Sequence, residues 1–227
     1  MPAVAGTNDD GVSPVPVGRL APLAAAADEE LRLAHAAREV ALRACRAAIQ
    51  ASGRSIRATH RHERDTAAAC LAQAGGDLLA AREALRDHPA LVAAGVLSDA
   101  EKEYAEAVLL SALACGGDLP GHRDVGVGAA AWFNGLAEAA SELRRHLLDL
   151  LRAGELARAE ALFAAMEEVY GALVTVDYPD AVTGGLRRTT DALRAVLERT
   201  RSDLTTTMLH ARLQSRIEQA LAAGEVT

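Results

Sequence analysis

Apolar residues recur at intervals of three and four along most of this chain, the spacing that gathers them on one face of an α-helix. The longest such pattern runs from Ala27 to about Ala74, with Gly53 as its only weak point, and Gly75-Gly76 is predicted to end it. No segment shows the apolar-polar alternation of a half-buried strand. The pattern therefore predicts an all-α protein.

Shorter helical patterns follow the long one. They are predicted over residues 77–86, 98–115, 129–152, 155–176 and 180–222, with an interruption of the last at Gly184-Gly185. Ser98 to Glu101 has the form of a capping box, and Gly116-Gly117 and Gly154 are predicted helix ends. Residues 1–20 lack periodicity and are predicted to be a disordered tail. Residues 21–227 are predicted to form one all-helical domain.

Composition narrows the class of protein. The net charge of −7 excludes a generally basic surface, so any contact with nucleic acid must use a local patch. Cys45, Cys70 and Cys115 are odd in number and lie in Ala/Leu runs, which predicts reduced core residues of a cytoplasmic protein. The sequence shows no signal peptide and no apolar run long enough to span a bilayer.

Two pairs of glutamates lie in apolar surroundings. Glu103 and Glu106 are three residues apart, and Glu138 and Glu142 are four apart, so each pair shares one helix face. Their helices are joined by a short loop and should be antiparallel neighbours. Because bare charges are costly to bury, four converging carboxylates predict a site for a hard divalent cation such as Mg²⁺ or Mn²⁺.

Two alternatives to this metal site stay open from the spacing alone. Each glutamate could be a solvated helix residue paired with Lys102, Arg144 or Arg145. A di-iron bundle would need Glu-x-x-His, and the nearest approach is Glu142 and His146, which are four residues apart rather than three.

A basic segment precedes the acidic pairs. Its members are Arg54, Arg57, His60, Arg61, His62 and Arg64, with only Glu63 against them. On a continuous helix the four arginines would form one stripe, and guanidinium groups bind phosphate oxygens in bidentate fashion. The segment therefore predicts a contact with phosphate groups, with the histidines as neutral hydrogen-bonding groups, while a solvated face with salt bridges is the alternative. No aromatic residue is interleaved, so base stacking on this stripe is not expected.

Several motifs together resemble the translin family, most closely its catalytic branch, the translin-associated factor X type and its prokaryotic relatives. They are Glu-Tyr-x-Glu-Ala at 103–107, Gly-x-Ala-Glu-x-x-x-Glu-Leu-x-Arg at 135–145, and Asp-Tyr-Pro-Asp-Ala-Val-Thr-Gly-Gly-Leu-Arg-Arg at 177–188. The likeness covers about residues 27–222. Two positions depart from the family pattern: Glu138 stands where the catalytic eukaryotic proteins commonly have Asp, and Trp132 where Tyr is usual.

The resemblance implies a bundle of about seven helices that assembles into a closed, barrel-like homo-oligomer, typically an octamer, with single-stranded RNA or DNA bound inside. It also implies cleavage of RNA with Mg²⁺ held by Glu103, Glu106, Glu138 and Glu142. The expected function is a metal-dependent endoribonuclease acting on single-stranded RNA. The alternative is a non-catalytic oligomer of the translin type that binds single-stranded RNA or DNA.

Overall fold

The computed structural model describes residues 20–222 and Gly224. The predicted disordered tail over residues 1–20 therefore lies outside the described residues, except for Leu20, which begins the first helix. Nine helices and no strand are found in the described part of the chain, which confirms the all-α prediction. They are α1 (Leu20–His60), α2 (Arg64–Ala84), α3 (Pro89–Ala93), α4 (Ser98–Cys115), α5 (His122–Val125), α6 (Ala129–Arg152), α7 (Leu156–Leu173), α8 (Asp180–Thr183) and α9 (Leu186–Ala222).

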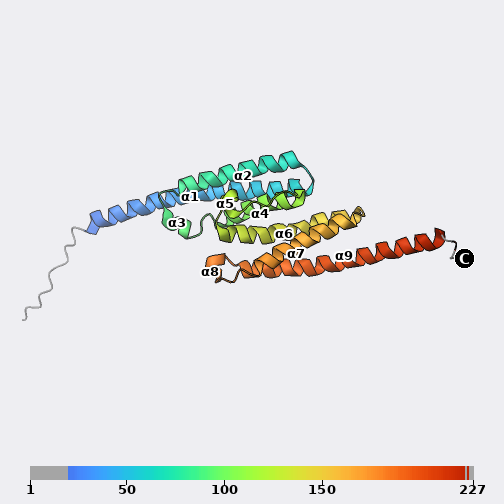
Figure 1. Cartoon of the computed structure of the whole chain (residues 1–227). Helices are drawn as coiled ribbons and strands as arrows, with labels where there is room; N and C mark the ends of the chain where they lie inside the picture. The colour runs from blue at the N-terminus through green and yellow to red at the C-terminus, as the bar shows by residue number, and fades with distance from the viewer. Residues whose placement is uncertain (1–19, 223, 225–227) are drawn as a thin grey trace, which may run out of the picture.

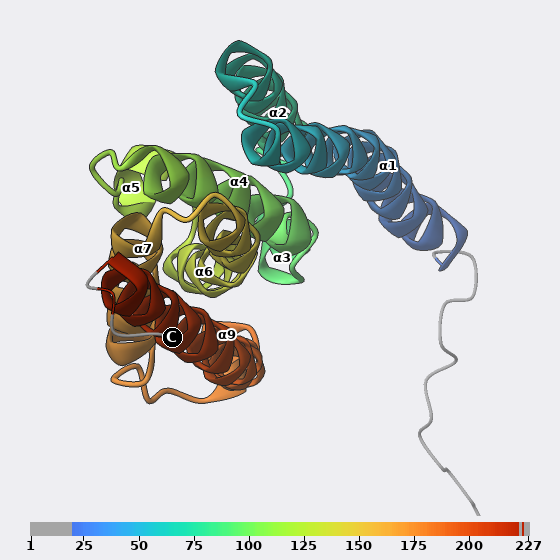
Figure 2. The same cartoon turned by 90° about the vertical axis from the view of Figure 1, so that its right-hand side faces the viewer.

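The six long helices lie roughly side by side, with α6 at the centre (Figures 1 and 2). The antiparallel pair α1 and α2 packs on α4, α4 packs on α6, and α7 and α9 cover the other side of α6. Alanine and leucine side chains dominate the core, as in Ala105, Leu109, Ala140 and Leu143, none of which is exposed. Small alanines let the helices approach closely, and this brings α4 and α6 near enough to share a polar site.

The first long helix is shorter than predicted. It ends at His60, and Arg61–Glu63 form a tight turn into α2, so the continuous pattern over residues 27–74 corresponds to a helical hairpin. His62 adopts a left-handed conformation with φ of 60°, and the Glu63 amide donates to the Ala58 carbonyl at 2.9 Å. These are features of a Schellman-type helix end, which usually carries glycine. Because a histidine takes the left-handed position, the sequence contains no obvious signal for this end.

Gly75 and Gly76 do not end a helix, contrary to the prediction, but lie within α2. A Cβ atom at Gly75 would stand 3.1 Å from the hydroxyl of Tyr104 on α4. Glycine at this position therefore serves the packing of Tyr104 against α2, and the surrounding contacts outweigh its low helix propensity.

The start and end of α4 follow the predicted positions, but the predicted capping box does not form. The helix begins at Ser98, and no side chain caps its first turn. The Glu101 carboxylate instead accepts hydrogen bonds from Arg82 at 2.6 Å and from the Gly128 amide at 3.4 Å. Glu101 thus ties α2 and the loop before α6 to α4. The predicted end at Gly116 is present, with this residue in a left-handed conformation.

Burial of the cysteines differs from the prediction at one position, and the last helix carries exposed apolar residues. Cys45 is buried and Cys70 half-buried, but Cys115 is exposed, so the prediction of three core cysteines is wrong for Cys115. The last part of α9 carries exposed Leu209, Leu213 and Ile217, whereas Leu193, Leu197 and Leu204 earlier in the same helix are buried within the chain. No helix among the described residues is both apolar enough and long enough to span a bilayer.

Candidate metal centre and nucleic-acid surface

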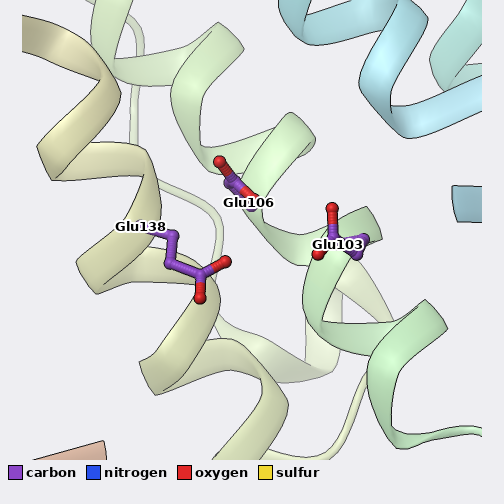
Figure 3. Close-up of side chains that lie close together, drawn as sticks. All are labelled: Glu103, Glu106 and Glu138. Atoms are coloured by element: carbon purple, nitrogen blue, oxygen red, sulfur yellow. The ribbon is translucent and has the colours of Figure 1, made fainter. Parts of the chain in front are cut away.

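Three glutamates meet where α4 and α6 pack together. Glu103 and Glu106 project from successive turns of α4, and Glu138 faces them from α6 (Figure 3). One carboxylate oxygen of each lies within 4.8 Å of the others. This brings together three of the four acidic residues predicted from spacing, on the two helices predicted to carry them.

The close approach of the two helices depends on Gly135, which lies one turn before Glu138. A Cβ atom at this position would stand 2.8 Å from the Glu106 amide nitrogen, 2.8 Å from the Ala105 Cβ and 2.9 Å from the Lys102 carbonyl oxygen. Real Cβ atoms do not approach backbone so closely. Gly135 therefore sets the helix spacing at which Glu138 can reach the α4 carboxylates.

Glu106 is the most constrained of the three acids. Its residue surface is only 7% exposed, and it forms no ion pair among the described residues. Burial, together with the charges of Glu138 and Glu103, raises the pKa of Glu106 to about 8. Without a cation this carboxyl is therefore mostly protonated at neutral pH, chiefly because burial disfavours its charged form.

Lys102 supplies part of that charge. Its ammonium group donates to both Glu138 oxygens at 3.0 Å and lies 3.3 Å from a Glu103 oxygen. Burial by itself would lower the pKa of Lys102, but the hydrogen bond and charge of Glu138 outweigh it and raise the pKa above its ordinary value. The pairing with Lys102 considered from the sequence is thus present for two of the glutamates, while Arg144 binds Asp203 instead.

Glu142 does not join the group of three. Its Oε2 atom lies 2.7 Å from Nε2 of His60, which reaches it from the end of α1. The predicted convergence of four carboxylates is therefore a convergence of three, with the fourth one turn further along α6 and held by a buried histidine. The assignment of Glu142 as a metal ligand stays a prediction.

Contrary to the prediction, the basic segment does not form one stripe on one helix. Arg54 and Arg57 lie on α1, Arg61 lies in the turn, and Arg64 begins α2. Arg54 donates to Gln73 at 2.8 Å and Arg61 to Glu63 at 2.8 Å, while Arg57 is exposed. His60 is only 7% exposed and points inward to Glu142, so it is not part of a basic surface. The arginines instead surround the end of the α1–α2 hairpin.

A hollow of about 490 Å³ lies over the acidic group. Glu106, Glu138 and Glu142 line one side of it, and Arg188 and Thr189 from the first turn of α9 line the other. The guanidinium of Arg188 forms no ion pair with any described residue. The sequence motif over residues 177–188 ends in Arg188, but it does not predict the position of this arginine opposite the acids, because that position depends on the packing of α9 on α6.

Known proteins resemble this chain over part or most of its length. No family model matches the chain. It is 30% identical over 126 residues to an uncharacterized protein of Methanocaldococcus jannaschii, a match that covers 55% of this chain. The match spans 56% of the length of that curated relative, a little more than half.

Solved structures match a larger share of this chain. The chain superposes on AfC3PO in a duplex RNA complex with a TM-score of 0.75 and 32% identity, covering 82% of this chain and 96% of that one. AfC3PO alone gives a TM-score of 0.75 and 31% identity, with 82% and 97% covered. The structure of apo-NeC3PO, at 18% identity, TM-score 0.71 and coverage of 86% and 99%, shows likeness of fold alone.

The helix order and the superposition on AfC3PO define an all-helical chain of the C3PO type. The chain belongs to the translin family. This confirms the resemblance seen in the sequence motifs.

Proposed function

We propose that this protein is a cytoplasmic endoribonuclease, dependent on Mg²⁺ or Mn²⁺, that binds and cleaves single-stranded RNA inside a closed homo-oligomer. The observation that carries the proposal is the buried Glu106, which lies against Glu103 and Glu138 at the floor of a hollow that also presents Arg188. AfC3PO, which shares 32% identity with this chain, has been described in a complex with duplex RNA, and this supports RNA as the polymer.

The residues present fit a hard divalent cation. All three converging ligands are carboxylates, the donors that Mg²⁺ and Mn²⁺ prefer, and the raised pKa of Glu106 indicates that a further positive charge would be favourable there. Glu103, Glu106 and Glu138 would hold the ion, with Glu142 one turn away. Such an ion activates water and stabilises the negative charge that develops at a phosphate.

Three side chains in or beside the hollow have roles that do not depend on the ion. Arg188 lies opposite the acids, where its guanidinium can bind a backbone phosphate and offset the repulsion between RNA and four carboxylates. His60 holds Glu142 through the 2.7 Å hydrogen bond and so fixes its orientation. Lys102 keeps Glu138 directed toward α4.

The second candidate function is a non-catalytic RNA- or DNA-binding oligomer in which the acids are structural. The bridge from Lys102 to Glu103 and Glu138 favours this alternative, because an ammonium group already occupies part of the space between the carboxylates. Incubation of a labelled single-stranded RNA with Mg²⁺, Ca²⁺ or EDTA separates the two. Internal cleavage with Mg²⁺ and none with EDTA supports the nuclease, whereas retention of intact RNA under all three conditions, with binding, supports the alternative.

Replacing Arg57 and Arg61 together with alanine is expected to weaken binding of single-stranded RNA. Each lost phosphate contact removes about one unit from the slope of log affinity against log salt, so the slope should flatten by roughly one or two units. Both side chains are exposed, so fold and oligomer should persist. Fluorescence anisotropy over a salt series gives the measurement.

The matched control replaces Arg86 and Arg123, two exposed arginines away from the α1–α2 turn. Arg86 follows α2 and lies roughly 30 Å along that helix from the turn. If the control pair flattens the slope as much as the Arg57 and Arg61 pair does, the effect is one of net charge, and the hairpin end is not the RNA contact.

The proposal of a homo-oligomer is based on exposed apolar side chains. Leu209, Leu213 and Ile217 in the last part of α9 are each about half exposed, as is Leu33 on α1. Such residues on two projecting helices indicate surfaces that neighbouring copies cover. We expect light scattering at micromolar concentration to give a mass several times 23.7 kDa, and Leu213→Gln combined with Ile217→Gln to lower it. A monomeric mass for the unaltered protein would contradict the proposal.

A further inference from the structure

A second cavity lies apart from the acidic group, beside the turn between α1 and α2. Its volume is about 150 Å³, and it is lined by Thr59, His62, Arg64, Leu71, Ala114 and His146, among others. A wider groove of about 600 Å³ shares His62, Arg64 and His146 with this cavity and adds Arg158. The cavity is smaller than the roughly 300–1,000 Å³ of pockets that hold a whole small molecule. It is suited to one group of a larger ligand, the remainder of which would lie in the groove.

Two of the residues that line the cavity carry buried polar atoms that the protein itself does not satisfy. Thr59 Oγ1 and His146 Nε2 are buried and have no hydrogen-bond partner among the described residues. The two residues are only 8% and 7% exposed. Since an unsatisfied buried donor or acceptor is costly, such atoms indicate a ligand that completes their hydrogen bonds.

Three histidine rings stand together at this place. The His146 ring centroid lies 5.0 Å from that of His60 and 5.5 Å from that of His62. His62 reaches this position only because its backbone adopts the uncommon left-handed conformation. Burial, and then the neighbouring His60 and His62, lower the pKa of His146 to about 4. The ring is therefore neutral at pH 7, with one nitrogen that donates and one that accepts.

These features match a nucleobase rather than a bare anion. Leu71 and Ala114 offer apolar contact to a flat ring, and His146 and Thr59 offer hydrogen-bonding atoms to its edge. Arg64 at the same cavity and Arg158 in the groove supply cations for the adjoining phosphates. An isolated phosphate would leave the apolar wall unused.

Overlapping hollows connect this cavity with the acidic group along α6. The hollow over the acids shares Ser141 and Glu142 with a second hollow, which is also lined by Arg145 and Asp149. Asp149 in turn lines the groove at His146. Glu138, Glu142, Arg145 and Asp149 are spaced by three and four, so they lie on one face of the helix. A nucleic-acid strand on this face would pass from the acids to the cavity.

We propose that the cavity at the α1–α2 turn receives one unpaired base of the RNA strand whose backbone lies over the acidic group, and that it thereby fixes which phosphate is presented to the acids. The inference rests on the proposed function in taking RNA as the polymer. It does not require that the RNA be cleaved.

The test uses the complete protein in EDTA and a set of single-stranded RNAs, each with 2-aminopurine at a different position. The fluorescence of this base rises when it leaves the stack of its neighbours. Ala68, which lines the cavity from α2, is replaced by leucine to fill it, and the neighbouring Ala69, which is likewise exposed but does not line the cavity, is replaced by leucine as the matched control. We expect enhanced fluorescence at one position with the unaltered protein and with Ala69→Leu. For Ala68→Leu the enhancement should disappear and RNA affinity should fall roughly tenfold, as for the loss of one base contact.

His146→Phe keeps a ring of similar size but removes the hydrogen-bonding nitrogens. It should keep the enhancement and reduce the difference in affinity between RNAs that carry different bases at that position. Equal enhancement with Ala68→Leu and with the unaltered protein, or enhancement at no position, overturns the inference.

Two further measurements distinguish a base site for RNA from a site for free nucleotides and from the proposed nuclease activity. Titration with adenosine monophosphate should give binding at least about tenfold weaker than that of the RNA, because the nucleotide lacks the contacts along α6. Tight binding of the free nucleotide that Ala68→Leu abolishes would overturn the assignment to an RNA strand. Cleavage is followed separately with Mg²⁺: a fluorescence signal without cleavage supports the base site and contradicts the nuclease.

Discussion

Glu106→Gln is expected to abolish RNA cleavage while leaving RNA affinity nearly unchanged. Glutamine keeps the size of the side chain and one acceptor oxygen, but it loses the negative charge that holds a hard divalent ion among Glu103, Glu106 and Glu138. The arginines that we propose as RNA contacts, such as Arg57 and Arg188, are untouched. Cleavage of a labelled RNA with Mg²⁺ and anisotropy in EDTA measure the two properties separately.

Glu168→Gln on α7 is the matched control, because this glutamate is exposed and lies outside the acidic group. It should retain full cleavage. Glu142→Gln should also lose cleavage, since Glu142 lines the same hollow. Full cleavage by both Glu106→Gln and Glu142→Gln would refute the catalytic assignment and leave the RNA-binding oligomer as the better explanation.

The same Glu106 variant should be more stable than the unaltered protein in EDTA, by an amount that grows with pH. The folded-state pKa of about 8 lies above the ordinary value of 4.5, so the folded protein binds this proton more tightly than the unfolded chain. Stability is therefore lost as pH rises from about 4.5 to about 8, on the order of a few kcal/mol. A glutamine at this position does not titrate, so the variant is free of this loss.

Melting temperatures in EDTA between pH 5 and pH 8.5 measure this dependence. The difference between the variant and the unaltered protein should widen up to about pH 8 and then stay constant. Added Mg²⁺ should raise the melting temperature of the unaltered protein more than that of the variant. A difference that is independent of pH would show that Glu106 is not held in its protonated form.

Gly135→Ala is expected to lower stability and disrupt the acidic group at the same time. The added methyl group would lie 2.8 Å from the Glu106 amide and 2.9 Å from the Lys102 carbonyl, both of which belong to the α4 backbone. Relief requires α4 and α6 to separate, which costs about 1–3 kcal/mol as for other overpacked sites. It would also move Glu138 away from Glu103 and Glu106. Thermal unfolding and Mg²⁺-dependent cleavage should therefore both be impaired.

Gly171→Ala on α7 provides the matched control. It is also a helical glycine, but nothing lies within 4 Å of the Cβ that it would gain. Alanine should stabilise this helix by about 0.5–1 kcal/mol, because glycine has the lower helix propensity. If Gly135→Ala showed the melting temperature and cleavage of the unaltered protein, the close contact between α4 and α6 would not be needed for the site.

The sequence predicts the helices well where their ends have local causes. Gly116 and Gly154 end helices in the left-handed conformation, as their positions after apolar patterns indicate. The prediction fails at the α1–α2 turn, because His62 adopts a left-handed conformation that is uncommon for histidine. It also fails at Gly75, because the reason for that glycine is Tyr104 on a distant helix.

In the candidate site, too, the sequence predicts the relations that depend on one helix and not those that depend on tertiary packing. Spacing alone pairs Glu103 with Glu106 and places Glu138 on the neighbouring helix, because these relations depend on helix geometry. The hydrogen bond from His60 to Glu142 joins residues 82 positions apart, and the hollow that sets Arg188 opposite the acids depends on the packing of α9. Such relations follow from tertiary packing, which the periodicity of one helix does not contain.

The order of the helices has a consequence for how quickly the chain reaches this state. The hairpin of α1 and α2 is closed by three residues, and α4 and α6 are separated only by residues 116–128. The two helices of each pair are thus joined by a short stretch of chain. Little conformational entropy is lost in closing these loops before the helices make contact. Folding rates fall as contacting residues become more distant in sequence. The protomer should therefore fold faster than a β-sandwich of equal length, and the three carboxylates should come together early, before α9 closes the hollow.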